Sequence, residues 1–551
     1  MIMAMFGSSC APKAAVDSNT LIFVTEDIPA GLDSDGPAAA IASTQTGFVN
    51  LMEPLVGYAR RGALPSGVGL PDPSRFDGRL AQSWHHDAAS NSWTFVLRRG
   101  VKSCVGNELT ADDVVYTFAR AKSVSGAAPI GWFLASVGSI AGFDNAVLTD
   151  KSKRVLGNEV EKIDRYTVRI RQSAPNPLFL HALATFGLLI FDSRAARSHA
   201  TTTDPWSHAY VNGVTAPGFG AYCLTRWVKG SEMVLRANPG WYRGRPAIDR
   251  VVMKRVPQSS NRYILLRMHA ASLAEHLTPR ETVKIATVKG ISVRGLVGNE
   301  NLFVHMNWKT PPFNDVRVRR AVAAALPTDW IIRNGYFGAA RRWQGVVPST
   351  YPGFVGDAAA FKTDLTRARA LLAEAGYRRG QGLDKYQGAF DLTYIAEKEG
   401  TLGPIASAVR SSLRSVGFPV ELDPIPSTQY GDRQLVKKDL GFALNDQEKP
   451  AAIDAGYAIQ LFFASPSAGG VNNMVNYSSA TVDELWTKAR TEPNSVRRQA
   501  LVEQIQRNLI ADVAWAPVVE YRTQWAMDDR LHGLAWYPDN AVRFGDLRFA
   551  K

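Results

Sequence analysis

The sequence has 551 residues, 46% of them hydrophobic and 21% charged, a composition that excludes a disordered, collagen-like or low-complexity chain and suggests roughly three to four domain-sized units. It contains no run of 18 consecutive apolar residues, which excludes a membrane-spanning helix. The 63 Lys and Arg against 50 Asp and Glu give a net charge of +13, but these basic residues occur as scattered pairs, which favours solvated faces over a nucleic-acid-binding surface.

Near the start of the chain, Cys10 follows an apolar stretch, residues 1–6, and the small residues 7–9. This arrangement is similar to the end of a bacterial lipoprotein signal, in which such a cysteine is lipidated, and we expect lipidation at Cys10 on this ground. The stretch is shorter than the roughly 7 to 15 residues of a full signal, so a start codon assigned too late is the alternative. We interpret residues 1–19 as a signal-like remnant or linker.

Strands and a capped helix are predicted in the first part of the chain. Residues 20–25 contain a short apolar run typical of a buried strand, and residues 93–97 alternate as a strand does. Over residues 109–120, Thr110 lies three residues before Asp113, as in a capping box, and the apolar residues that follow share one face. This pattern predicts a helix.

Further helices are predicted in the second half. Apolar residues recur with helical spacing over residues 314–326, 364–375 and 495–512. Pro327 follows the first of these segments, and Ser495 is expected to cap the last. We interpret these apolar stripes as core packing, so the chain is expected to have an α/β architecture.

Motifs of catalysis or metal binding are missing from the sequence. It has no G-x-S-x-G elbow, phosphate-binding loop, G-x-G-x-x-G or H-E-x-x-H motif. The run Asp33-Ser-Asp35-Gly36 lacks the remaining ligands of a calcium loop. The three cysteines, Cys10, Cys104 and Cys223, have no zinc-type spacing, and we infer neither a metal site nor a disulfide framework from them. A binding protein without cofactor or metal is therefore expected, not an enzyme.

Several segments of the chain carry a resemblance to a known family. They are Leu80–Trp84, Trp93–Lys102, Leu109–Phe118, Ala216–Tyr222, Asn238–Pro246, Pro311–Ala321 and Arg369–Tyr377. In this order they resemble segments of the family 5 solute-binding proteins of bacterial ABC importers, the group that contains dipeptide- and oligopeptide-binding proteins. The run from Leu80 to Phe118 is the most specific part, and the resemblance covers nearly the whole chain.

The family's W-x-x-D-x-x-D-P segment is matched only in part. Asp446 and Pro450 keep its spacing, but the tryptophan is absent and Lys449 stands at the second aspartate. The resemblance implies that Asp446 is the carboxylate that binds the α-ammonium group of a peptide ligand. Trp132, Trp227 and Trp343 are further candidates that could stack on a ligand, although each is also explained by packing.

The resemblance also implies a fold: an α/β, two-lobed periplasmic-binding-protein fold of the class II type, in its large three-domain variant, with a hinge between the lobes. The expected lobe 1 core is discontinuous, and an extra domain is inserted into it. The boundaries are 20–56, 200–300 and 520–551 for the lobe 1 core, 57–199 for the extra domain and 301–519 for lobe 2. The hinge is expected near Phe303, Asn307, Pro517 and Glu520.

The function implied is that of an extracytoplasmic receptor that closes over di- or oligopeptides and delivers them to the permease subunits of an ABC importer. It is expected to be a monomer that binds no nucleic acid, either free in the periplasm or lipid-anchored at the outer face of the cytoplasmic membrane. An opine, an oligosaccharide or a nickel chelate are alternative ligands. An unrecognised hydrolase, or a basic adhesin or nucleic-acid binder, are alternatives of another class.

Overall fold

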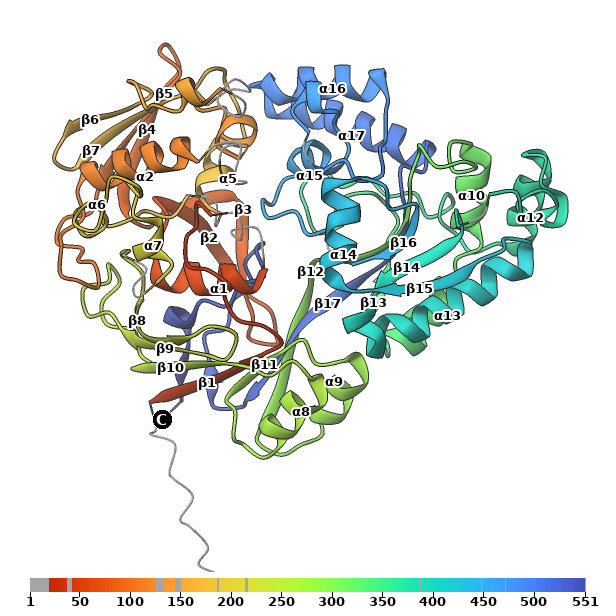
Figure 1. Cartoon of the computed structure of the whole chain (residues 1–551), viewed down its shortest axis with the longest axis horizontal. Helices are drawn as coiled ribbons and strands as arrows, with labels where there is room; N and C mark the ends of the chain where they lie inside the picture. The colour runs from red at the N-terminus through yellow and green to blue at the C-terminus, as the bar shows by residue number, and fades with distance from the viewer. Residues whose placement is uncertain are drawn as a thin grey trace, which may run out of the picture.

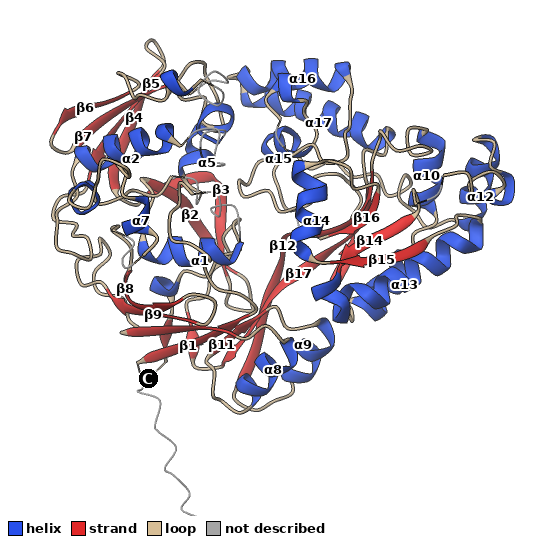
Figure 2. Ribbon diagram, viewed as in Figure 1, coloured by secondary structure: helices blue, strands red, loops and turns tan. Residues whose placement is uncertain are grey.

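The computed structural model describes residues 19–36, 42–124, 130, 133–143, 150–185, 188–213, 217–386, 388–446, 448–470 and 472–550. These residues form two lobes that lie side by side, the first built mainly from the N-terminal half of the chain (Figure 1). Both lobes mix helices and strands (Figure 2).

A mixed sheet runs through both lobes and joins them. Over the described residues it has 11 strands, in the order β15-β14-β16-β12-β17-β11-β1-β10-β9-β8, with β13 beside β17. The two longest, β12 (Ile291–Met306) and β17 (Ala516–Asp528), are antiparallel neighbours that pass from one lobe to the other. The remaining strands are β1 (Thr20–Thr25), β8 (Tyr222–Val228), β9 (Glu232–Ala237), β10 (Arg250–Arg255), β11 (Leu273–Glu275), β13 (Ala340–Arg342), β14 (Asp391–Ile395), β15 (Glu421–Ile425) and β16 (Phe442–Asn445).

Smaller sheets lie in the N-terminal half. One has the order β4-β5-β7-β6 and another pairs β2 with β3. Their bounds are Val56–Ala63 for β2, Gly69–Gly78 for β3, Ala81–Asp87 for β4, Ser92–Leu97 for β5, Val160–Asp164 for β6 and Thr167–Arg171 for β7. Near the C-terminus, β18 (Leu531–His532) pairs with β19 (Arg548–Phe549).

Helices pack around these sheets. In the first lobe they include α1 (Ala42–Leu51), α2 (Ala111–Ser123), α5 (Phe179–Leu183), α6 (Ser193–Arg197), α7 (His208–Val211), α8 (Ser259–Arg267) and α9 (Pro279–Ile285). In the second they include α10 (Val316–Ala324), α12 (Leu365–Glu374), α13 (Glu399–Val416), α14 (Ser427–Gly431), α15 (Ala455–Phe462), α16 (Ala480–Thr491) and α17 (Ser495–Ala511). Among the residues described, none of the helices combines the length and the hydropathy needed to cross a membrane.

The predicted local elements are present. Residues 20–25 form β1, and residues 93–97 lie in β5. The capping box precedes α2, where the backbone N–H of Thr110 donates to Asp113 Oδ2 over 2.7 Å. The predicted cap of α17 was wrong by one residue, because the side chain that accepts from the backbone of Arg497 belongs to Asn494 and not to Ser495.

Each part of the fold has its own buried apolar cluster. The first-lobe cluster includes Leu21, Phe23, Leu235 and Met527, and so gathers residues from both ends of the chain. A second cluster joins β5, β7 and α2 with neighbouring segments, and a third fills the second lobe from β12 to α17. Burial of these apolar stripes is the main stabilising contribution to such cores. The domain boundaries given above stay a prediction.

The cysteine expectation was wrong, since the structure contains a disulfide between Cys104 and Cys223. Their Cα atoms are 5.5 Å apart, although the residues are 119 positions apart in the sequence. Cys104 precedes α2 and Cys223 lies in β8, so the bond fastens the loop before α2 to the first-lobe sheet. Such a pairing depends on tertiary proximity, which an odd cysteine count does not show.

Candidate functional site

The pairing of β12 and β17 is irregular where these strands cross between the lobes. Val297 pairs with Arg522, and the next pair in line is Asn301 with Glu520. Residues 298–300 therefore lie opposite a single residue of β17. An irregularity of this kind bends a strand and increases its local twist. The crossing is thus a bent segment rather than a straight ladder.

Asn299, within this irregular segment, connects the two lobes. Its Nδ2 donates to the carbonyl oxygen of Pro450, in the segment that follows β16, over 3.0 Å. It also donates to the carbonyl oxygen of Pro538, in the C-terminal segment, over 2.6 Å. Because Asn299 is buried, these hydrogen bonds satisfy an amide that has no access to water, and they fix the junction.

Two ion pairs lie beside this junction. Lys398 Nζ is 2.7 Å from Asp446 Oδ2, and Lys449 Nζ is 2.9 Å from Glu300 Oε2. The carboxylate side chains are 9% and 6% exposed, and the lysines 30% and 25%. Charges this well covered are screened less by salt than surface pairs. The paired lysines therefore compensate carboxylates that water reaches poorly.

A carboxylate of the first lobe faces the same place. Glu26 follows β1, and its Oε1 lies 3.4 Å from His276 Nδ1. His276 lowers the pKa of Glu26, and Lys398 and Lys449 of the second lobe lower it further. The lysines are therefore within electrostatic reach of the first lobe. We call Glu26, Glu300, Lys398, Asp446 and Lys449 the interlobe charge cluster.

Two stacked tyrosines border the interlobe charge cluster. The rings of Tyr336 and Tyr521 have their centroids 4.9 Å apart, with an angle of 11° between the planes. Burial raises the pKa of both hydroxyls well above the ordinary value, and the negative charges of Asp446 and Glu300 add to this effect. Both tyrosines are therefore neutral hydrogen-bonding groups at physiological pH.

Glu448, next to Lys449, is a buried carboxyl of a different kind. It accepts a hydrogen bond from Gln434 Nε2 over 2.8 Å. Burial raises the pKa of Glu448 to about 7, although Gln434 and Lys449 act in the opposite direction. The group is thus close to half protonated at neutral pH, and it can serve as donor or acceptor.

The chemistry available at this junction is recognition. Ion pairs, neutral tyrosine hydroxyls and a buried carboxyl can orient a polar solute through hydrogen bonds. In the part of the chain that the structure describes, no group of three His, Cys, Asp or Glu side chains could hold a metal ion.

Comparison with protein families distinguishes the receptor function from the alternatives of a hydrolase, an adhesin or a nucleic-acid binder. The model of the bacterial extracellular solute-binding proteins, family 5, matches residues 75–469. The chain belongs to this family. It is accordingly a solute-binding receptor of an ABC importer, an extracytoplasmic protein and not an enzyme. The predicted family and function class are confirmed at this level.

Relatives and solved structures agree with this assignment. The receptor is 24% identical over 463 residues to the probable D,D-dipeptide-binding periplasmic protein DdpA of Escherichia coli K12, covering 84% of this chain and 82% of DdpA. The structure of DppA from Helicobacter pylori with the peptide STSA gives a TM-score of 0.79 at 21% identity, over 97% of this chain and 98% of DppA. The structure of MoaA from A. tumefaciens R10 with mannopinic acid gives a TM-score of 0.75 at 22% identity, and it covers 97% of this chain and 100% of MoaA. At these identities the structures show the fold, and the predicted two-lobed α/β class is confirmed.

The aromatic residues predicted for the receptor's site have different places. Trp343 is 1% exposed in the second-lobe core, where its Nε1 donates to the carbonyl oxygen of Val347. Trp227 is half-buried on β8, at the far end of the sheet order from β14 and β16, with Lys229 Nζ 4.9 Å from its ring centroid. Neither belongs to the interlobe charge cluster. Trp132 and the lipidation candidate Cys10 lie outside the described residues.

The predicted hinge residues of the receptor also spread out. Phe303 is buried and stacks on Trp515, with ring centroids 4.1 Å apart. Pro517 of β17 is the strand partner of Phe303. Asn307 follows β12 and donates from Nδ2 to the carbonyl of Leu440. Glu520, opposite Asn301, flanks the first register shift between β12 and β17, and the pair Phe303 and Pro517 flanks the second, between Leu302 and Phe303.

Sequence reasoning located Asp446 and missed its neighbours. Glu300 stands in the run Asn299-Glu300-Asn301, and polar residues inside a long, otherwise buried strand were a readable signal. Glu26 and Lys398 follow strands and carried no such signal. Lys398 approaches Asp446 because β14 and β16 are parallel neighbours, whereas Glu26 follows β1, which four strands separate from β14 in the same sheet.

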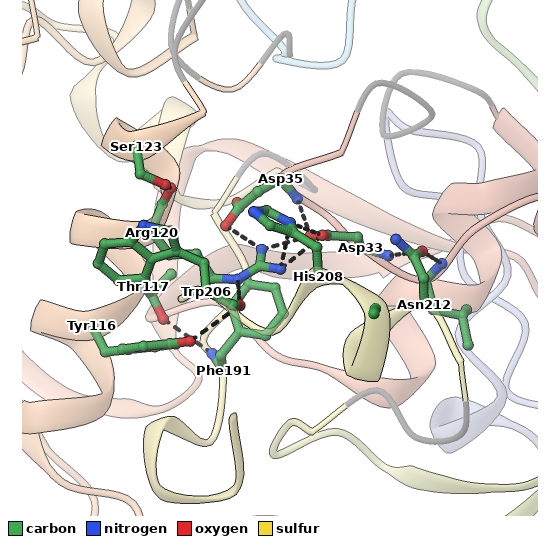
Figure 3. Close-up of polar contacts among 12 residues, drawn as sticks. Asp33, Asp35, Tyr116, Thr117, Arg120, Ser123, Phe191, Trp206, His208 and Asn212 are labelled. Atoms are coloured by element: carbon green, nitrogen blue, oxygen red, sulfur yellow. Dashed lines mark hydrogen bonds and ion pairs between the residues drawn. The ribbon is translucent and has the colours of Figure 1, made fainter. Parts of the chain in front are cut away.

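Asp33 and Asp35, the carboxylates of the run that is similar to part of a calcium loop, form ion pairs with a buried arginine instead. Arg120, fully buried on α2, donates to Asp33 Oδ1 over 2.6 Å and to Asp35 Oδ2 over 2.7 Å (Figure 3). His208 Nδ1 lies 2.5 Å from Asp33 Oδ2. The aspartates thus compensate a buried guanidinium and fasten the segment after β1 to α2.

A small pocket of about 40 Å³ lies apart from the interlobe charge cluster, within the first lobe. Its lining includes Glu53, Arg79, Trp241, Arg543 and Asp546. Sites for organic ligands usually measure roughly 300 Å³ or more. The pocket is therefore too small to hold a peptide or an opine.

Proposed function

We propose that this receptor binds di- or oligopeptides between its lobes and delivers them to the permease subunits of its importer. The relative DdpA is named as a probable D,D-dipeptide-binding protein, and the DppA structure contains a peptide. The observation that carries the proposal is the interlobe charge cluster, because its members come from both lobes. A ligand stabilises the closed arrangement only if it contacts both sides.

The lobes contact one another in a way that suits such a closure. The backbone N–H of Ile453 in the second lobe donates to Tyr58 Oη in the first over 3.0 Å. Gln460 Nε2 donates to the carbonyl oxygen of Ser136 over 2.9 Å. We propose that the irregular crossing of β12 and β17 is the hinge, with Glu520 at its centre, since two connecting strands can bend there together.

An opine is the second candidate ligand. The MoaA structure contains mannopinic acid and covers almost the whole of this chain, with a TM-score of 0.75. The positively charged side chains of the interlobe charge cluster, Lys398 and Lys449, can bind carboxylates as readily as Asp446 can bind an ammonium group.

The remaining parts of the proposal concern the cell envelope. We propose that the receptor acts as a monomer without nucleic-acid partners, and that it is either free in the periplasm or anchored through Cys10. The disulfide between Cys104 and Cys223 supports an oxidising compartment, where such bonds persist.

Native mass spectrometry of the purified receptor tests the ligand class. We expect an added mass that fragments as a peptide and that disappears when the protein is unfolded and refolded. The refolded receptor should then regain the mass from a peptide mixture and return the peptides chemically unchanged. An added mass matching an opine would replace the peptide proposal, and peptide cleavage with turnover would contradict the receptor role altogether.

A further inference from the structure

Lys398 and Asp446 are placed side by side by the sheet itself. Strands β14 and β16 are parallel neighbours, with Leu392 opposite Phe442. Lys398 ends the short helix η6 (Ala396–Lys398) directly after β14, and Asp446 directly follows β16. Because the carboxyl ends of parallel strands point the same way, both side chains emerge at the edge that faces the other lobe.

The resulting ion pair resembles the contact that a ligand would make. The ε-ammonium of Lys398 is 2.7 Å from the Asp446 carboxylate, a distance typical of a charge-assisted hydrogen bond. A ligand ammonium at Asp446 Oδ2 would compete with this chemically equivalent group. The exchange gains one ammonium–carboxylate contact and loses another, and it leaves Lys398 without that partner in a region where it is only 30% exposed.

No other carboxylate of the interlobe charge cluster offers an easy alternative. Glu300 has Lys449 at 2.9 Å, and Glu26 has His276 at 3.4 Å. Within the described residues, each carboxylate of the cluster thus has a basic side chain of the protein against it. A solute that brings its own ammonium group must break an internal pair, whereas an uncharged polar group need not.

We propose that Lys398 is a specificity-determining residue that occupies the ammonium position at Asp446, so that the receptor selects solutes with a blocked amino terminus, such as N-acylated peptides. This inference rests on the proposed peptide function. The acyl group of such a solute is neutral and needs no carboxylate partner, so the ion pair stays intact.

Calorimetry with Ala-Ala-Ala and its N-acetyl derivative tests the selection on the wild type and on Lys398→Met. The wild type should bind the acetylated peptide at least tenfold more tightly. Lys398→Met should reverse the order, because Asp446 then lacks the lysine. The matched control is Lys437→Met, which removes a lysine 2.6 Å from Asp432 in an exposed pair of the same lobe, and it should keep the wild-type order. Tighter binding of the free peptide by the wild type overturns the proposal.

A ligand-free measurement separates this inference from the proposed function. Asp446→Asn and Lys398→Met should each lower the melting temperature by several degrees, and the double variant should fall no further, since both remove one interaction. Additive losses overturn the inference. If the wild type binds neither peptide and Lys398→Met binds the free one, Lys398 blocks Asp446, but the selection of N-acylated peptides is overturned. If neither protein binds either peptide, the inference fails.

Discussion

At the level of single residues, Asp454 shows how burial and pairing oppose one another. It caps α15, where its Oδ1 accepts from the backbone N–H of Tyr457 over 3.0 Å. Arg498 of α17 donates to both of its oxygens, over 2.8 and 2.9 Å. Burial alone would raise the pKa of Asp454, but the Arg498 guanidinium outweighs it and lowers that pKa to about 2. The ionised form is therefore stabilised by folding.

Asp454→Asn should lower the free energy of unfolding at pH 7 by about 2 kcal/mol, because the pKa falls from 3.8 in the unfolded chain to about 2 on folding. A lowered folded pKa means that this stability is present above about pH 4 and is lost as the pH falls towards 2. Urea unfolding at a series of pH values checks this, since the two proteins should converge in acid. A difference that does not change with pH would assign the effect to packing instead.

Within the interlobe charge cluster, Asp446 could be identified from the sequence and Lys398 could not. Asp446 was recognised because its spacing from Pro450 survives in a known segment. Lys398, 48 residues earlier in the chain, reaches it only through the pairing of β14 and β16. Its place in the charge cluster follows from strand order, which no local pattern encodes.

At the level of elements, the disulfide between Cys104 and Cys223 ties the loop before α2 to β8 across 119 residues of chain. A bond that closes so long a loop strongly restricts the unfolded chain, by about 4 to 5 kcal/mol in the chain-entropy description. Of the sheet β4 to β7, the strands β6 and β7 lie within the closed loop, whereas β4 and β5 precede Cys104.

The double variant Cys104→Ser/Cys223→Ser should unfold with a free energy lower by about 4 kcal/mol. Chemical denaturation checks the value, and wild-type protein in reductant should behave as the variant does. Reductant should leave the double variant itself unchanged. A loss below about 1 kcal/mol would mean that packing between the loop and β8 already holds the two together.

Local elements were predictable because their determinants lie close together in the sequence. The strand β1 and the helices α2, α10, α12 and α17 follow from apolar patterns within a few positions, and for α2 from a capping box as well. The irregular pairing of β12 with β17 was not predicted. It arises between Val297 and Asn301 from an alignment of strands more than 200 residues apart, so it depends on the folded sheet.

At the level of the whole molecule, the first lobe meets the second through a chain of hydrogen bonds centred on Tyr58. Its hydroxyl accepts from the backbone N–H of Ile453 over 3.0 Å and lies 2.8 Å from His181 Nδ1. Burial lowers the pKa of His181 to about 4, so the ring is neutral near pH 7. Nδ1 can then accept a hydrogen bond from the Tyr58 hydroxyl, while the Tyr58 oxygen accepts one from the backbone N–H of Ile453. The buried hydroxyl thus joins the two lobes.

Tyr58→Phe should favour the open form of the receptor, because it leaves the buried N–H of Ile453 without an acceptor whenever the lobes meet. The loss of such a bond is expected to raise the ratio of open to closed molecules about fivefold or more. Small-angle scattering of ligand-free protein checks this as a larger radius of gyration than that of the wild type. The matched control is Tyr477→Phe, which removes a hydroxyl that donates to Asp512 over 2.9 Å within the second lobe. This control should lower the melting temperature and leave the radius unchanged, so equal radii for all three proteins would show that Tyr58 does not govern closure.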